Sequence, residues 1–261
     1  MQFNFFSLGG GQFWADVFFY QKWRIQRNCV SKSYRLLDPW DIVRHKGSFE
    51  SCRKAFVEFI DIYELPRQKG SMIVMLHGFG QTKNVFKALW RKALERKFMA
   101  AAVNYPSMQE KSESHIRQMI FFLNNLEDVS EVSFISYGEG SLLLNMLLSI
   151  PAPWQKKFKI GRIAQIEPRE ECSRWLQLLQ RFSLSRWICG PMLDELSDEG
   201  IAKFPPLPQK FECGKIYITK NNEKNKKGEK NIIKIKNVIG SPLKNRDVIN
   251  AAINFIYKGE F

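Results

Sequence analysis

Short apolar runs recur along the chain from residue 71 onward, and segments with helical periodicity separate them. A continuous apolar run that ends in turn residues is typical of a strand buried on both faces. Such runs predict strands at 72–76, 99–103, 132–136, 162–166, 215–219 and 232–236. Apolar residues recur at helical spacing within 82–97, 116–123, 142–148, 175–182 and 248–256. Strands that alternate with helices predict an α/β fold, in which helices cover both faces of a parallel sheet.

Residues 1–70 follow this pattern less clearly. A helix is expected over 52–63, whereas 13–39 is rich in aromatic residues without a clean period. We therefore predict an N-terminal extension, 1–70, packing on an α/β domain that comprises 71–261. The aromatic residues at the start of the chain are interpreted as packing on the core or covering its cleft. The alternative is an amphipathic segment at a membrane surface.

The composition favours a folded protein without a membrane span, a zinc site or a disulfide framework. With 44% hydrophobic residues, the 261-residue chain can bury a full core. It has no apolar run of about 18 residues that would span a membrane, and its start does not resemble a signal peptide, so we expect a cytoplasmic protein. Five dispersed cysteines, none in a C-x-x-C pair, indicate neither a zinc site nor a disulfide framework. We predict no cofactor and no metal.

The formal charge of +14 is unevenly distributed. Seven lysines and two glutamates lie within 220–236, which leaves +9 for the rest of the chain. The Lys/Asn-rich segment between the last two strands is predicted to be a mobile loop. We interpret the remaining excess as a solvated surface. Attraction to an anionic membrane surface is the alternative, and nucleic acid is a less favoured partner.

Two turns at predicted strand ends carry a family resemblance: MLHGFG at 75–80 and VSFISYGEGS at 132–141. Together they resemble the α/β-hydrolase superfamily, in particular its bacterial lipase- and esterase-like members. Segments NYPS at 104–107, IGRIAQIEP at 160–168, RWICGP at 186–191 and VINAAINFIYKGEF at 248–261 extend the resemblance over about 71–261. It implies an α/β-hydrolase fold with an oxyanion hole formed by two backbone N–H groups. The HG turn, His77-Gly78, would position the backbone N–H of Phe79 as the first of these donors. The backbone N–H of Glu139 would be the second.

The departures from the family pattern concern catalysis. Laid on G-x-S-x-G, residues 136–140 put Gly138, which has no side chain, at the nucleophile position. No histidine follows residue 115, so the loop before the last helix, 238–242, lacks a general base. Glu223 could fill the acid position, but it would have no base to orient. We therefore predict a vestigial nucleophile position at Gly138 and no catalytic residue.

The other candidate residues are interpreted structurally. An acidic side chain at 139 would oppose a developing oxyanion, so we expect Glu139 to point to solvent or to pair with a lysine; a carboxylate in new chemistry is the alternative. We expect His77 to brace the HG turn by hydrogen bonding and His115 to be satisfied on or near a helix face. Ser136 and Ser141 suit tight packing, and His45 would reach the cleft only through folding of the extension.

These inferences favour a non-catalytic α/β-hydrolase homologue that binds a small molecule or a protein. The Phe79 and Glu139 N–H groups would then bind an ester, acid or phosphate without cleaving it, unless side chains fill the cleft. The second hypothesis is an active hydrolase of carboxylic esters or lipids with a rebuilt site. The third is a basic protein associated with a membrane surface or with nucleic acid.

Overall fold

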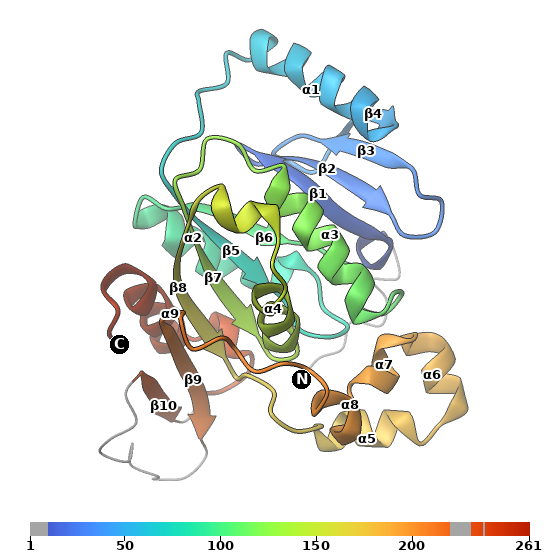
Figure 1. Ribbon diagram of the computed structural model, residues 1–261, viewed down its shortest axis with the longest axis vertical. Helices are drawn as coiled ribbons and strands as arrows, with labels where there is room; N and C mark the ends of the chain where they lie inside the picture. Colours follow the sequence, from blue (N-terminus) through green and yellow to red (C-terminus); the bar gives the residue numbers. More distant parts are fainter. Residues whose placement is uncertain (1–9, 220–230, 237) are drawn as a thin grey trace.

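The computed structural model describes residues 10–219, 231–236 and 238–261, and its larger sheet has six strands (Figure 1). All five neighbouring pairs are parallel, in the order β10-β9-β8-β7-β5-β6. The strands are β5 (Ser71–Leu76), β6 (Met99–Val103), β7 (Glu131–Tyr137), β8 (Lys159–Ile166), β9 (Cys213–Thr219) and β10 (Ile232–Lys236). The predicted α/β fold with a parallel sheet is confirmed, and each predicted strand lies within an observed one.

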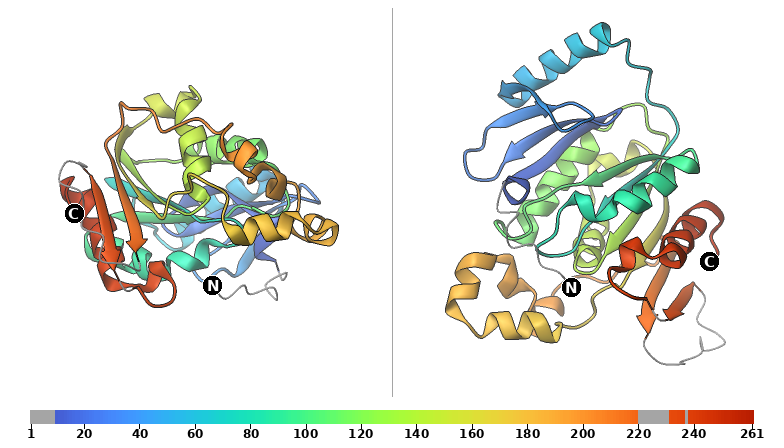
Figure 2. Two further views of the ribbon diagram at one scale, coloured as in Figure 1. Left: turned by 90° about the horizontal axis from the view of Figure 1, so that it is seen from below. Right: turned by 180° about the vertical axis from the view of Figure 1, so that it is seen from behind.

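Helices cover both faces of this sheet, which explains the continuous apolar runs (Figures 1 and 2). Side chains alternate along a strand: Ile73 and Met75 of β5 pack in one apolar cluster, and Val74 and Leu76 in the other. The first cluster includes residues of α2 (Lys87–Glu95) and α9 (Arg246–Lys258), and the second those of α3 (Ser112–Asn124) and α4 (Gly140–Ser149).

Short helices connect β8 to β9 and lie together beside the sheet (Figure 1). They are α5 (Arg174–Gln180), α6 (Ser183–Cys189), α7 (Met192–Glu195) and α8 (Asp198–Ile201). The helix predicted over 175–182 is shorter than expected, since Phe182 follows α5 and is exposed. Single 3-10 turns occur at η2 (Gly11–Phe13), η3 (Lys83–Phe86), η4 (Pro153–Lys156) and η5 (Pro242–Lys244).

The N-terminal residues form a second sheet that the sequence did not reveal. It is antiparallel, in the order β1-β2-β3-β4, and α1 (Phe49–Ile62) packs against it. The strands are β1 (Trp14–Tyr20), β2 (Trp23–Asn28), β3 (Tyr34–Leu37) and β4 (Val43–Gly47). The helix predicted over 52–63 corresponds to α1, which begins after its N-cap Ser48. A register shift in β1 leaves Val17, Phe18 and Phe19 all buried, so no alternating pattern is visible in the sequence.

The small sheet contacts the large one beside β6. The N–H of Asp16 donates to the carbonyl of Asn104 (2.8 Å), and the N–H of Asn104 donates to Oδ2 of Asp16 (2.7 Å). Phe19 of β1 belongs to the apolar cluster of the large sheet, whereas Phe18 packs with α1. The division into domains at residue 70 stays a prediction.

The order of the strands places a topological switch point between β5 and β7. The chain passes from β5 to β6 on one side and then returns to place β7 on the other side of β5. In open parallel sheets, such a switch in direction leaves a crevice at the carboxyl ends of the two strands. Here those ends carry the HG turn and the Gly138 turn.

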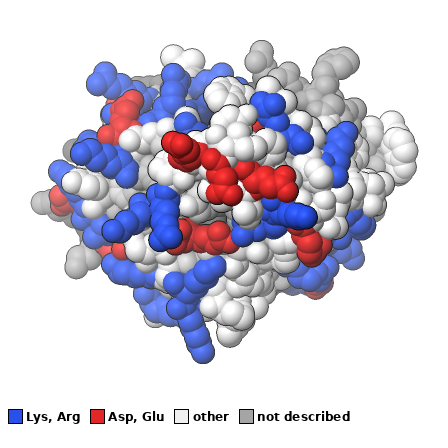
Figure 3. Space-filling view, turned by 90° about the horizontal axis from the view of Figure 1, so that it is seen from above, with Lys and Arg blue, Asp and Glu red and all other residues white. Residues whose placement is uncertain are grey.

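On the face seen in Figure 3, basic side chains do not form one continuous patch. Figure 3 shows one face of the molecule, on which acidic side chains gather near the middle with Lys and Arg around them. The loop predicted to be mobile falls largely at 220–230, outside the described residues. Among the described helices, none combines the length and apolar character needed to cross a membrane.

Candidate functional site at the carboxyl ends of β5 and β7

Gly138 lies between the end of β7 and the start of α4 in a left-handed conformation, with φ +56°. Its N–H donates to the carbonyl of Ile166 (3.0 Å), and its carbonyl accepts from the hydroxyl of Ser141 (2.7 Å). Residues with a Cβ seldom adopt this backbone conformation, because the Cβ approaches the next carbonyl oxygen too closely. Glycine has no Cβ and adopts it without this steric cost. A Cβ at Gly138 would meet no atom within 4 Å, so the position is strained for other residues but not crowded.

The HG turn and the Gly138 turn are in direct contact. A Cβ at Gly140 would lie 2.5 Å from the carbonyl oxygen of His77 and 2.6 Å from that of Leu76. Real Cβ atoms essentially never come this close to backbone atoms. Gly140 is therefore required by the approach of α4 to the end of β5, whereas Gly138 is favoured by its own backbone angles.

Glu139 folds back onto the HG turn. Its carboxylate is buried, with 7% of the residue exposed, and Oε2 accepts the N–H of Phe79 at 3.1 Å. Oε1 accepts from Nε of Arg169 at 3.0 Å, in an ion pair. The expectation that Glu139 would point to solvent or pair with a lysine is wrong. The end of β8 brings an arginine beside the turn, and two donors compensate the burial of the carboxylate.

This arrangement limits the anions that the HG turn can bind. The N–H of Phe79, one of the two donors implied by the family resemblance, already donates to a carboxylate oxygen of the same chain. A second anionic oxygen at that position would have to displace Glu139 and would be repelled by its charge.

His77, Tyr105 and His115 form a buried group beneath the HG turn. The rings of His77 and Tyr105 stack with their centroids 4.0 Å apart. The Tyr105 ring also contacts the His115 ring, with centroids 5.3 Å apart. Nδ1 of His77 donates to the carbonyl of Gly78 (2.8 Å), while the Tyr105 hydroxyl donates to the carbonyl of His77. Burial lowers the pKa of both histidines to about 4, so both are neutral at pH 7. These contacts agree with a bracing role for His77.

The structure brings some of the remaining candidates to the site and leaves others apart. Ser141 lies in the Gly138 turn, and its Oγ also accepts the N–H of Arg169 (3.2 Å). Ser136 is fully buried in β7. His45 belongs to β4, where its Nε2 is 2.6 Å from the hydroxyl of Ser51. Glu223, considered for the acid position, lies outside the described residues.

Sequence inspection missed Arg169 and Tyr105. Tyr105 stood within the NYPS segment that carried the family resemblance, so its position next to the HG turn was foreseeable. Nothing in the sequence paired Arg169 with Glu139, because 30 residues separate them and only the pairing of β7 with β8 brings them together.

At least three cavities lined by described residues lie elsewhere, and none of these three is lined by Phe79, Gly138 or Glu139. One, of about 330 Å³, lies between the small sheet and α2. Another, of about 550 Å³, adjoins α7 and α8, and the third, of about 250 Å³, lies between β1 to β3 and α3. Within the described part of the chain, no group of three or more His, Cys, Asp or Glu residues could hold a metal ion.

Solved structures with a similar fold include esterases and other hydrolases. Esterase B from Lactobacillus rhamnosis has 15% identity over 60% of this chain and 58% of its own, with a TM-score of 0.40. An extracellular α/β-hydrolase from a Paenibacillus species has 11% identity over 69% and 98%, with a TM-score of 0.45. The 2-hydroxy-6-oxo-6-phenylhexa-2,4-dienoate hydrolase of Rhodococcus sp. strain RHA1 has 8% identity over 86% and 89%, with a TM-score of 0.39.

No family model matches the chain, and no curated protein matches it either. The identities are low and the TM-scores lie below 0.5, so these structures carry no argument about substrate or activity.

Proposed function

We propose that this chain is a non-catalytic α/β-hydrolase homologue that acts by binding a small molecule or a protein partner. The observation that carries the proposal is the hydrogen bond from the Phe79 N–H to the Glu139 carboxylate, next to Gly138. The family mechanism needs a nucleophile at one position and a free donor at the other. Here the first position has no side chain, and the donor at the second is engaged.

The two histidines near the HG turn are also poorly suited to accept a proton. His77 and His115 are buried, and their lowered pKa values reflect the cost of charging them there. Accepting a proton from a nucleophile would require that charge. Ser107, Ser136 and Ser141 are also buried, with at most 1% of each residue exposed. They are poorly placed to replace the missing nucleophile.

Ester hydrolysis and serine labelling test this proposal together. The purified protein is incubated with p-nitrophenyl butyrate and with a fluorophosphonate probe, which labels activated serines. We expect no labelled band at 30.6 kDa and no turnover above background. An oxyanion hole without a triad can still give roughly 10³–10⁴-fold over water, so only turnover of the order of 1 s⁻¹ or faster counts as catalysis.

Matched variants identify the source of any activity. Glu139→Ala frees the Phe79 N–H, and Glu139→Gln keeps an acceptor there; both should stay inactive, because neither adds a nucleophile or a base. Turnover by the wild type that disappears in Glu139→Gln would instead make the carboxylate catalytic. Labelling abolished by Ser107→Ala, Ser136→Ala or Ser141→Ala would establish an active hydrolase with a rebuilt site. Either result contradicts the proposal.

A further inference from the structure

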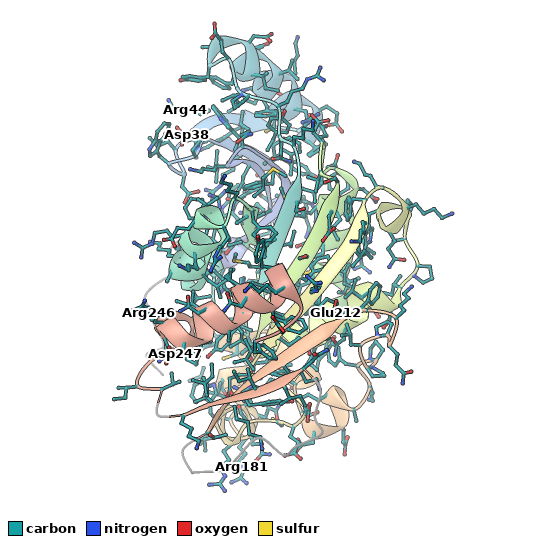
Figure 4. All side chains as sticks on the ribbon, turned by 90° about the vertical axis from the view of Figure 1, so that its left-hand side faces the viewer. Asp38, Arg44, Arg181, Glu212, Arg246 and Asp247 are labelled. Carbon is teal, nitrogen blue, oxygen red and sulfur yellow. The ribbon has the colours of Figure 1, made fainter. Side chains whose placement is uncertain are left out.

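The cavity between the small sheet and α2 has an apolar base and a cationic rim. Phe19 and Phe86, both buried, line it together with Trp90 of α2. The loop after β3 forms the opposite wall through Pro39, Trp40 and Asp41, and Figure 4 shows Asp38, at the start of this loop, above α2. Its volume of about 330 Å³ lies at the lower end of the range for small-molecule sites, roughly 300–1,000 Å³.

Four basic residues line the cavity against one acidic residue. Asp41 is shared, since Oδ1 accepts from Nη2 of Arg24 (2.9 Å) and Oδ2 from Nζ of Lys83 (2.7 Å). Lys22 and Lys87 form no ion pair with any described residue, and Nζ of Lys22 lies 5.1 Å above the Trp90 ring. Burial, and then the charge of Arg24, lower the pKa of Lys83. The lining therefore has a formal excess of three positive charges.

The wall that carries Trp40 is held in place before any ligand arrives. Oδ1 of Asp38, a buried residue, accepts the N–H groups of Trp40 and Ile42, both at 2.9 Å. Its Oδ2 accepts from Nε of Arg44 at 2.8 Å, and Figure 4 shows Asp38 and Arg44 side by side. This fixed loop presents the Trp40 side chain with 76% of the residue exposed. Little ordering is then required on binding, which favours affinity.

We propose that this cavity binds a small organic anion composed of a phosphate group and a flat aromatic ring. Lys22 and Lys87, which have no acidic partner among the described residues, supply charge for the phosphate. The Arg24 guanidinium offers the planar donor set that suits phosphate oxygens. Trp40, which is largely exposed, supplies an aromatic face for the ring, since offset or edge-to-face contacts between aromatic rings are favourable. This cavity is separate from the Gly138 turn, so the proposed binding does not depend on the proposed lack of catalysis.

Three probes separate the charge from the ring. Phenyl phosphate, inorganic phosphate and phenol are titrated into the full chain at low salt, by calorimetry and by tryptophan fluorescence. We expect phenyl phosphate to bind about tenfold or more tightly than inorganic phosphate, because the ring adds a stacking contact. Phenol should bind more weakly than either anion, and added salt should weaken phenyl phosphate binding.

The double variant Lys22→Gln, Lys87→Gln tests the two lysines of the cavity that are not paired with Asp41. It should weaken phenyl phosphate binding by about tenfold or more, because two charge-assisted contacts are lost. The control changes two exposed lysines that do not line the cavity, Lys54→Gln and Lys156→Gln, and removes the same total charge. The affinity of this control for phenyl phosphate should stay within about twofold of the wild-type value, which is less than the loss of one binding contact would cause. Thermal melting establishes that both variants fold.

Several outcomes would overturn the proposal. Wild-type protein that shows no saturable binding of phenyl phosphate up to about 10 mM has no such site of useful affinity. Equal weakening in the two double variants would mean that total charge, rather than this cavity, attracts the anion. Inorganic phosphate that binds as tightly as phenyl phosphate would remove the aromatic part of the proposal. An unchanged phenyl phosphate affinity in Trp40→Ala would show that Trp40 does not contact the ring.

Discussion

Gly138 and Glu139 are neighbours in the turn between β7 and α4, and each limits the chemistry of that turn in a different way. Gly138, the proposed nucleophile position, has no side chain and adopts a left-handed conformation with φ +56°. The Glu139 carboxylate accepts hydrogen bonds from the Phe79 N–H and from the Arg169 side chain. The identity of Gly138 was visible in the sequence, but the direction of the Glu139 side chain depends on partners from two other strand ends.

Replacing Gly138 by serine tests the conformation of the turn. Gly138→Ser should lower the free energy of unfolding by about 1–3 kcal/mol, because a residue with a Cβ is strained at this φ although space is available. Gly138→Asn is the matched control and should lose less, since asparagine tolerates the left-handed region better. Urea unfolding gives both values. A serine variant as stable as the wild type would mean that residue 138 has ordinary backbone angles in solution.

The same serine variant should remain without esterase activity. A hydroxyl at 138 still lacks a base to take its proton, because no histidine follows residue 115 and the two buried histidines resist protonation.

At the scale of elements, the strands of the large sheet were predictable and those of the small sheet were not. The strands buried on both faces read as unbroken apolar runs, such as that of β5. In β1, the register shift between Asp16 and Phe18 breaks the two-residue period, so the aromatic residues gave no strand signal. At α5, the helical spacing of apolar residues continued to the exposed Phe182, past the end of the helix, so the predicted helix was too long.

Asn104 joins the two sheets and offers a test of that junction. Its buried side chain donates to the carbonyls of Gly11 and Trp14, both at 2.6 Å, and accepts the N–H of Lys83 at 3.2 Å. Asn104→Ala should lower the free energy of unfolding by about 2–4 kcal/mol, because it leaves buried backbone groups without partners.

An exposed asparagine on the adjoining 3-10 turn provides the control for Asn104. Asn84→Ala should change the free energy of unfolding by no more than about 0.5 kcal/mol, as is usual at the surface. Both values come from urea unfolding monitored by circular dichroism. Equal effects of the two substitutions would show that the polar junction between the sheets does not contribute to stability.

At the scale of the whole molecule, burial of the His77–Tyr105–His115 group makes stability depend on pH. Each histidine has a pKa near 6.5 when unfolded and about 4 in the fold, so between these values the unfolded chain binds more protons. Stability contributed by the neutral rings is therefore complete above about pH 6.5 and is lost as the pH falls toward 4. The loss should reach up to about 3 kcal/mol per histidine.

Substitution separates this effect from that of the carboxylates. His115→Phe should lose less stability than the wild type between pH 7 and pH 4.5, because one buried group no longer titrates. His45→Gln, which removes a histidine of the small sheet, serves as the comparison. The free energy of unfolding is measured in urea at both pH values. Identical losses for the wild type and His115→Phe would show that His115 does not contribute to the pH dependence.

The sequence by itself determined the parallel sheet with its covering helices, since unbroken apolar runs and helical periods are local patterns that burial imposes. It also determined that position 138 lacks a nucleophile and that no late histidine is available. The tertiary structure alone decided that Glu139 binds the Phe79 N–H, that Asp16 meets Asn104, and that Lys22 and Lys87 share a cavity with Trp40. These contacts join residues distant in the chain, and their partners depend on strand pairing and side-chain direction, which no local pattern records.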